Sequence, residues 1–132
     1  MSIRILHVLD HSLPLHSGYT FRTLALLREQ RAMGWQTIQL TTPKHGSGGP
    51  LEERVDGWDF HRTPGGKGSG LLSQMRLTAT RLMQVIAATR PDVIHAHSPV
   101  LNVLPSLWVG RRSNLPVVYE VRAFWEDAAV DH

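Results

Sequence analysis

Apolar positions along this chain fall into short continuous runs that alternate with longer stretches in which they recur every three or four residues. The short runs are typical of strands, and we expect strands at residues 3–9, 35–42, 55–63, 93–96 and 116–121. The first of these runs is mostly apolar, whereas residues 35–42 alternate between two kinds of side chain.

The longer stretches predict helices at 18–33, around 72–86 and at 100–112. In the first helix Leu24, Leu27 and Ala32 are expected to face the sheet, and Gly34 follows where a C-terminal glycine is favoured. The apolar face of the second helix is expected to consist of Leu72, Met75, Ala79, Leu82 and Ile86.

The third helix contains Pro105, which a helix tolerates only in its first turn, and Asn114 is expected to end it. Another helix is expected to begin at residues 123–130. The predicted order is β-α-β-β-α-β-α-β. This alternation predicts one α/β domain, a Rossmann-like doubly wound and mostly parallel sheet with helices on both faces.

Composition fits an ordinary globular domain, because 42% of the residues are hydrophobic and 19% are charged. The chain has no cysteine, which excludes disulfides, thiolate metal sites and cysteine nucleophiles. We find no apolar run of membrane-spanning length, and the first residues enter a strand pattern without a signal-peptide layout. A cytoplasmic domain is therefore expected.

The formal net charge is +3 and is carried mainly by arginine. Arginine suits phosphate and carboxylate groups, so anionic partners are compatible with the sequence. No recognition motif for nucleic acid is present, and no aromatic platform is interleaved with the basic residues. Nucleic acid is therefore not expected as a partner.

The loop that follows the first strand, at residues 10–17, lacks the Gly-x-Gly-x-x-Gly pattern of dinucleotide-binding domains, which argues against an NAD site. It leads instead to Gly18 at the start of a helix. Gly18 either simply starts the helix or allows an anion or sugar hydroxyl to approach the backbone N–H groups there. Asp10 also suggests a response-regulator receiver domain, but the acidic and lysine residues which that class needs on later strands are absent.

The segment Arg90 to Pro99 ends a buried strand on two histidines, His95 and His97. Alternation along a strand places both on the same side. The carboxyl ends of strands in an open α/β sheet form the floor of the ligand crevice, so the histidines are candidates for chemistry there. They are equally compatible with hydrogen-bonded packing positions.

Three segments resemble the N-terminal domain of family-four (group 1) retaining glycosyltransferases of the GT-B architecture. They are residues 5–9 with the loop into 17–20, residues 91–97, and residues 115–122. The stretch Tyr119 to Asp127 is similar to the bacterial exopolysaccharide branch associated with exosortase systems. The resemblance covers essentially the whole chain in order and spacing.

This resemblance implies roles for individual residues of the chain. Gly18, with Ser17 and Tyr19, matches the family's glycine loop near the donor diphosphate. His97 matches the histidine that hydrogen-bonds the reacting sugar, whereas His95 is expected to be structural.

Asp10 and Glu120 are expected to support these site residues. Arg122 stands where the family commonly has a Thr-x-His ending, and it is expected to offer a charged fork to a phosphate or an acidic sugar. Glu120 is equally suited to be the partner of that arginine.

The resemblance further implies that residues 1–132 form the acceptor-side domain and that a C-terminal domain binds most of the nucleotide-sugar. We expect the chain to be a fragment that is inactive alone. Its substrates would be a nucleotide-sugar and a glycan or lipid-linked acceptor, and no metal or other cofactor is expected.

Alternatives remain at this stage. The chain is also compatible with a non-catalytic stand-alone domain or with one chain of a split enzyme, which an apolar patch after Trp125 would favour. A metal site would use His11, His16, His95 and His97. Peripheral contact with the inner face of a membrane would use the basic helix residues Arg76, Arg81, Arg111 and Arg112.

Overall fold

A computed structural model describes residues 2–46, 49–65 and 70–122. The strands of this part are β1 (Arg4–Leu9), β2 (Gln36–Thr41), β3 (Glu52–Val55), β4 (Trp58–Arg62), β5 (Val93–His97) and β6 (Val117–Glu120). The helices are α1 (Gly18–Ala32), the short 3-10 helix η1 (Pro43–His45), α2 (Leu71–Thr89) and α3 (Val100–Ser113). The strands form one sheet in the order β3-β4-β2-β1-β5-β6, in which only β3 runs antiparallel to its neighbour.

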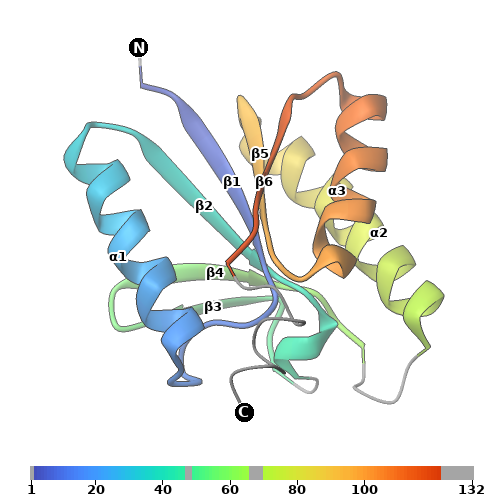
Figure 1. Cartoon of the computed structure of the whole chain (residues 1–132), viewed down its shortest axis with the longest axis horizontal. Coiled ribbons are helices and arrows are strands. Elements are labelled where there is room, and N and C mark those ends of the chain that lie inside the picture. Colours follow the sequence, from blue (N-terminus) through green and yellow to red (C-terminus); the bar gives the residue numbers. More distant parts are fainter. Residues whose placement is uncertain (1, 47–48, 66–69, 123–132) are drawn as a thin grey trace.

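The chain leaves the centre of this sheet in two directions. From β1 it passes through α1 to β2 on one side, and from β5 it passes through α3 to β6 on the other. Right-handed crossovers in opposite directions place α1 on one face of the sheet and α2 with α3 on the other, as Figure 1 shows. The predicted Rossmann-like α/β fold is confirmed.

The apolar core lies between the sheet and the pair α2 and α3. It consists of Leu6, Val8, Leu40, Leu82, Val85, Ile94 and Val109, each at most 1% exposed. Leu6 and Val8 alternate with His7, so every second side chain of β1 points to this core and His7 points to the α1 face.

The α1 face is divided between an apolar and a polar part. Leu24 and Leu27 of α1 pack with Leu13 and Phe60 over β4, away from the centre of the sheet. Over the central strands, the side chain of Gln30 on α1 contacts His7 instead. Ala32, expected to face the sheet, is exposed because it lies in the last turn.

The predicted strand at 55–63 is in fact a hairpin. Asp56 and Gly57 both have positive φ, 51° and 83°, and form a two-residue turn between β3 and β4. An Asp-Gly pair between strand segments is a strong hairpin signal. Gly57 therefore lies in the turn, and β3 becomes the antiparallel strand at one edge of the sheet.

Two details of the predicted helices are also corrected. Leu72 is 75% exposed, because the buried side of α2 follows Gln74, Thr78, Leu82 and Val85. Pro105 lies inside α3, beyond its first turn, and is buried. A proline there removes only one helical hydrogen bond, and burial of its ring among the neighbouring elements offsets part of that loss.

The predicted helix ends are confirmed. Gly34 follows α1 with φ 87°, and Asn114 ends α3 in the left-handed conformation with φ 57°. The helix expected at 123–130, and the apolar patch expected after Trp125, lie outside the described residues. Within the described ranges, no helix combines the length and the apolar character that crossing a membrane requires.

Gly110 is the position in α3 where the helix approaches the sheet most tightly. A Cβ built there would lie 2.6 Å from Val117 Cγ2 and 3.0 Å from the Leu115 carbonyl oxygen, whereas a Cβ on Gly18 meets nothing within 4 Å. We expect Gly110→Ala to lower the free energy of unfolding by about 1–2 kcal/mol, since overpacking outweighs the gain in helix propensity. Urea unfolding of Gly110→Ala and Gly18→Ala tests this. Equal stability of the two variants would contradict the close packing of α3.

Candidate active site

The loops that follow β1 and β5 diverge at the C-terminal edge of the sheet. Residues 10–17 lead from β1 to α1, whereas Ser98 and Pro99 lead from β5 to α3 on the opposite face. In open α/β sheets ligands bind at such a point, where neighbouring strands connect in opposite directions. All three α-helices of the described part begin at this edge, which is the lower edge of the view in Figure 1.

Three histidine rings lie together under α1 at this point. His95 and His97 stack with ring centroids 4.3 Å apart and planes inclined by 5°, so they share one side of β5 as predicted. His7, on the neighbouring strand β1, lies 4.9 Å from His95 and 5.1 Å from His97. His7 and His97 are both 0% exposed.

The hydrogen bonds of these rings have one consistent direction. Arg122 can only donate, so its NH2 group, 2.7 Å from His97 Nδ1, makes that nitrogen an acceptor. A neutral His97 then carries its proton on Nε2 and donates it to His7 Nδ1 at 2.8 Å. His7 in turn donates from Nε2 to Gln30 Oε1 at 2.7 Å. We call this series, Arg122–His97–His7–Gln30, the histidine chain.

Burial keeps the rings of the histidine chain neutral. Desolvation lowers the pKa of His97 to about 4, and the neighbouring His95 and Arg122 act in the same direction. The pKa of His7 is lowered as well, first by burial and then by the charges that His97 and His95 would carry. Both rings are therefore neutral at pH 7, as the direction of the hydrogen bonds requires.

Hydrogen bonds and an aromatic ring fix the side chain of Arg122. It donates from Nε to Glu120 Oε2 at 3.0 Å, from NH1 to the Tyr19 carbonyl oxygen at 2.8 Å and from NH2 to Thr23 Oγ1 at 2.7 Å. Its guanidinium also lies 4.1 Å from the centre of the Tyr19 ring. With a side chain only 5% exposed, Arg122 joins the end of β6 to the first turns of α1.

His95 and Glu120 form the more accessible part of the cluster. Glu120 Oε1 lies 3.3 Å from His95 Nε2, and their side chains are 33% and 14% exposed. Glu120 Oε2 lies 3.6 Å from His97 Nδ1, which already accepts from Arg122, so the ion pair with Arg122 is the closer contact of this carboxylate.

The N-terminus of α1 forms the second wall. Ser17 Oγ accepts from the Thr20 N–H at 3.0 Å and so caps the helix. His11 bridges Ser17 Oγ, at 2.8 Å, and Asp10 Oδ2, at 2.9 Å. Gly18 is exposed and leaves open space where a Cβ would stand.

Tyr19 links this wall to the sheet. Its hydroxyl oxygen accepts from the Asp10 N–H at 3.0 Å, and burial raises the pKa of the phenol well above its usual value. The hydroxyl is therefore protonated at all ordinary pH values. Tyr19 fixes the first loop through its hydroxyl and supports Arg122 with its ring and its carbonyl oxygen.

His7, His95 and His97 are also the described residues whose nitrogens lie close enough to surround a metal ion, within 4.8 Å of one another. A metal would have to take lone pairs that His7 and His97 use in the histidine chain. It would also lie beside the Arg122 guanidinium, which repels cations. The arrangement therefore fits a hydrogen-bonded cluster better than a metal centre.

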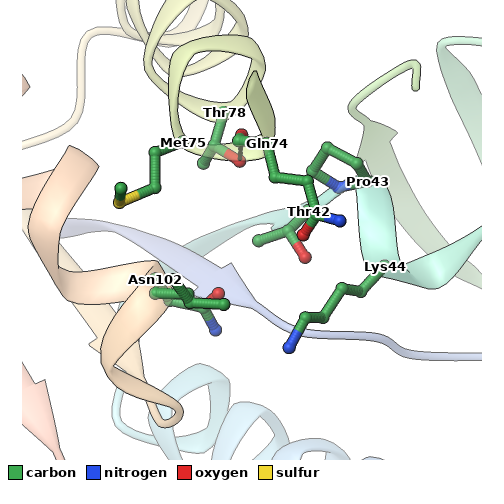
Figure 2. Close-up of a pocket in the computed structure, with 8 residues that line it drawn as sticks. Thr42, Pro43, Lys44, Gln74, Met75, Thr78 and Asn102 are labelled. Atoms are coloured by element: carbon green, nitrogen blue, oxygen red, sulfur yellow. Dashed lines mark hydrogen bonds between the residues drawn. The ribbon is translucent and has the colours of Figure 1, made fainter. Parts of the chain in front are cut away.

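A separate small cavity lies between η1, α2 and α3. Figure 2 shows Thr42, Lys44, Gln74 and Asn102 around it. Its volume is about 10 Å³, close to the minimum that a single water molecule requires. It is therefore too small for a sugar. Lys44, 39% exposed and 3.9 Å from Asp10 Oδ1, supplies positive charge near the end of β1.

The structure thus brings most of the predicted site residues together. Tyr19, His95, His97, Glu120 and Arg122 form one cluster, and Ser17, Gly18 and Asp10 line the adjoining loop and helix start. Sequence reasoning missed His7, Gln30 and Thr23. A detectable signal existed for His7, because it is a polar residue in the middle of an apolar strand, and such residues need a buried partner. Gln30 and Thr23 resemble ordinary helix-surface residues and gave no such signal.

The described residues thus form a Rossmann-like α/β domain with a buried polar cluster at the C-terminal edge of its sheet. Residues 17–132 match the family model described as "Glycosyl transferase 4-like domain". The chain belongs to this family. A search of curated protein sequences found no significant match.

The buried histidines make stability depend on pH. The folded pKa of His97 is about 4 and that of His7 is lowered, whereas both rings titrate near 6.5 when unfolded. The unfolded chain therefore binds more protons between pH 6.5 and 4, so the free energy of unfolding falls as the pH decreases. We expect up to about 1.4 kcal/mol per pH unit for each ring, measured by urea unfolding across this window.

His97→Gln removes one of these titrating rings and should make the pH dependence shallower. The matched control is His16→Gln, since His16 is exposed on the first loop and makes no contact with the histidine chain. A slope that is the same in His97→Gln and in the unmodified protein would show that His97 is not buried in its neutral form.

Proposed function

We propose that this chain is the acceptor-side domain of a retaining glycosyltransferase that uses a nucleotide-sugar. In the reaction, the bond between the sugar C1 and the diphosphate oxygen breaks, and a bond from C1 to an acceptor hydroxyl oxygen forms. The acceptor proton leaves with the nucleoside diphosphate or passes to solvent. No carboxylate pair of the glycoside-hydrolase kind is needed for this, and no metal or other cofactor is part of the proposal.

The buried polar cluster at the switch point carries this proposal. Apolar side chains at the positions of His97, Glu120 and Arg122 would close this part of the domain without the cost of desolvating charges, and such replacements are often neutral or stabilising. A cluster of this kind, placed where α/β sheets bind ligands and occurring in a glycosyl transferase 4-like domain, supports a catalytic role over a purely structural one.

Each part of the site has a distinct task in this proposal. The N–H groups at Gly18 and Tyr19 face the donor diphosphate with the positive end of α1. The exposed edge of the cluster, Glu120 and His95, faces the sugars. His97 is engaged at both nitrogens in this conformation, so a direct bond to the reacting sugar requires it to exchange one partner.

Arg122 has a different task from the phosphate fork that was expected from its side-chain chemistry. Its N–H groups are directed at Glu120, Tyr19, Thr23 and His97. We therefore propose that it fixes the orientation of His97 and Glu120. Positioning of this kind matters because small displacements of reacting groups cost large factors in rate.

The same proposal includes a second domain and an acceptor for the complete protein. A C-terminal domain of the complete protein would hold most of the nucleotide-sugar, and residues 1–132 alone would transfer no sugar. The acceptor would be a glycan or lipid-linked saccharide at the cytoplasmic side, in bacterial exopolysaccharide synthesis. If the chain is instead one chain of a split enzyme, the same surface would face the second domain, and a partner protein would supply that domain.

His97→Ala tests the reaction centre. In the complete protein it should lower kcat/KM by about 10²-fold, because the reacting sugar loses the histidine that Arg122 positions. Activity is measured as nucleoside diphosphate released from UDP-glucose, UDP-galactose or GDP-mannose, with polyprenyl-diphosphate-linked sugar as acceptor. His61→Ala, on β4 and outside the cluster, is the matched control. An unchanged kcat/KM in a folded His97→Ala protein would remove His97 from the site.

We also propose peripheral membrane contact, and the exposed surface that best supports it lies on α3. Leu104, Leu107 and Trp108 are 47–49% exposed on this helix, next to Arg111 and Arg112. Arg112 lies 4.8 Å over the Trp108 ring. An apolar stripe with a tryptophan and flanking arginines suits the interface of an anionic bilayer.

The arginines predicted on α2 contribute less to this surface. Arg81 donates to the Arg62 and Leu51 carbonyl oxygens and so holds α2 to the sheet. Arg76 remains exposed.

Sedimentation with anionic phosphatidylglycerol vesicles at low salt tests the membrane surface. We expect binding that weakens at high salt and that Trp108→Ala reduces severalfold, since both charge and an interfacial anchor are involved. Trp35→Ala, which removes a partly exposed tryptophan after α1, should bind as the unmodified protein does. Sedimentation that is the same with and without vesicles would contradict membrane contact.

A further inference from the structure

A larger cavity lies away from the histidine chain, between the first loop, the end of η1 and the end of β4. Its volume is about 290 Å³. Pro14, Leu15, Leu51 and Pro64 give it apolar walls. Ligand pockets in proteins start at about 300 Å³, so this cavity suits one small ring rather than a nucleotide.

One buried hydroxyl in the wall has no partner. Thr63 is 1% exposed, and its Oγ1 makes no hydrogen bond to any described residue. An unsatisfied buried hydroxyl destabilises the folded state. Because no bond holds the hydroxyl, rotation about χ1 can turn it toward the cavity, where a ligand hydroxyl would satisfy it.

Two further polar groups reach the same cavity. His45 Nδ1 accepts from the Ser12 N–H at 3.3 Å, and burial lowers the pKa of this ring to about 4. The neutral ring therefore carries its proton on Nε2, which is a donor. Glu53 also lines the cavity. Its Oε1 accepts from Arg62 Nε at 3.1 Å and NH2 at 2.8 Å, which leaves Oε2 as an acceptor.

The charges of this cavity cancel. The ion pair between Glu53 and Arg62 leaves no net charge at the wall. Arg62 NH1 donates to Thr41 Oγ1, and NH2 donates to the Leu13 carbonyl oxygen as well as to Glu53. A charged ligand would therefore find no counter-charge. A neutral ligand with several hydroxyls and apolar C–H faces matches the donor, the acceptors and the walls together.

We propose that this cavity is a subsite for a single neutral sugar residue of the acceptor. The proposal rests on the transferase function, since it gives that function a place for the acceptor chain at the same edge of the sheet as the histidine chain. The apolar walls contact the C–H face of the ring, and Thr63, His45 and Glu53 bind its hydroxyls. Direct recognition of hydroxyls makes the subsite selective against deoxy sugars, because a missing hydroxyl leaves buried groups unpaired.

Saturation-transfer and chemical-shift NMR test the subsite with methyl α-glucopyranoside, methyl α-mannopyranoside and methyl β-galactopyranoside. At least one should bind and shift the signals of Thr63 and His45. Thr63→Val should weaken this binding at least tenfold while leaving Tm unchanged or raised, since it removes an unpaired buried hydroxyl. The control is Thr89→Val, whose hydroxyl bonds within α2 to the Val85 carbonyl oxygen at the opposite edge of the sheet. Binding of none of the three glycosides, or binding that Thr63→Val leaves intact, overturns the subsite.

Kinetics of the complete protein separate this proposal from the transferase function. Thr63→Val should raise KM for the acceptor at least tenfold and leave KM for the nucleotide-sugar unchanged. Glycoside binding at Thr63 in a protein without transferase activity would retain the subsite and reject the proposed function. Transfer that depends on His97, together with an unchanged acceptor KM in Thr63→Val, would retain the proposed function and reject the subsite.

Discussion

The histidine chain is the interaction on which the arrangement of this domain depends. It joins Arg122, two residues beyond β6, to β5, β5 to β1, and β1 to α1, through groups that are almost completely buried. Each ring has one donor and one acceptor nitrogen, so its direction is fixed once Arg122 donates to His97. Removing one member leaves the next one buried without a partner, which costs more than the bond itself contributes. The position of α1 over the sheet follows from this constraint.

The chain also explains why the two faces of the sheet differ. Leu6, Val8 and Ile94 give the face under α2 and α3 an apolar core, and packing there needs no specific direction. Over the central strands of the α1 face, His7, His95 and His97 lie together, and hydrogen bonds rather than apolar packing provide the specificity there. In such a domain the apolar face of the sheet stabilises the fold, and the other face holds the polar groups. A substrate site can form on the polar face at little further energetic cost, because its polar groups are already held in fixed orientations.

The sequence allowed most of the fold to be predicted, because periodicity, Gly34 and Asn114 act locally. The hairpin at Asp56 and Gly57 was missed although its signal is local, since one continuous strand explained the same apolar residues. The site was predicted in part. His97 follows from the family resemblance, whereas the bonds of His97 to His7 and of Arg122 to Thr23 join side chains 90 and 99 positions apart. The bond from His7 to Gln30 spans another 23 positions. No spacing rule encodes contacts of that kind.

The hairpin has a consequence for how this sheet can be extended. β3 is a four-residue strand with Glu52, Glu53 and Arg54 in its sequence, and it runs against the direction of the other strands. Short, charged edge strands discourage pairing with further strands. At the opposite edge, β6 is parallel to its neighbour and exposes Val118 and Tyr119 by 52% and 37%. Of the two borders of the described sheet, the one at β6 is therefore more favourable for an additional strand, from the same protein or from another, than the charged border at β3.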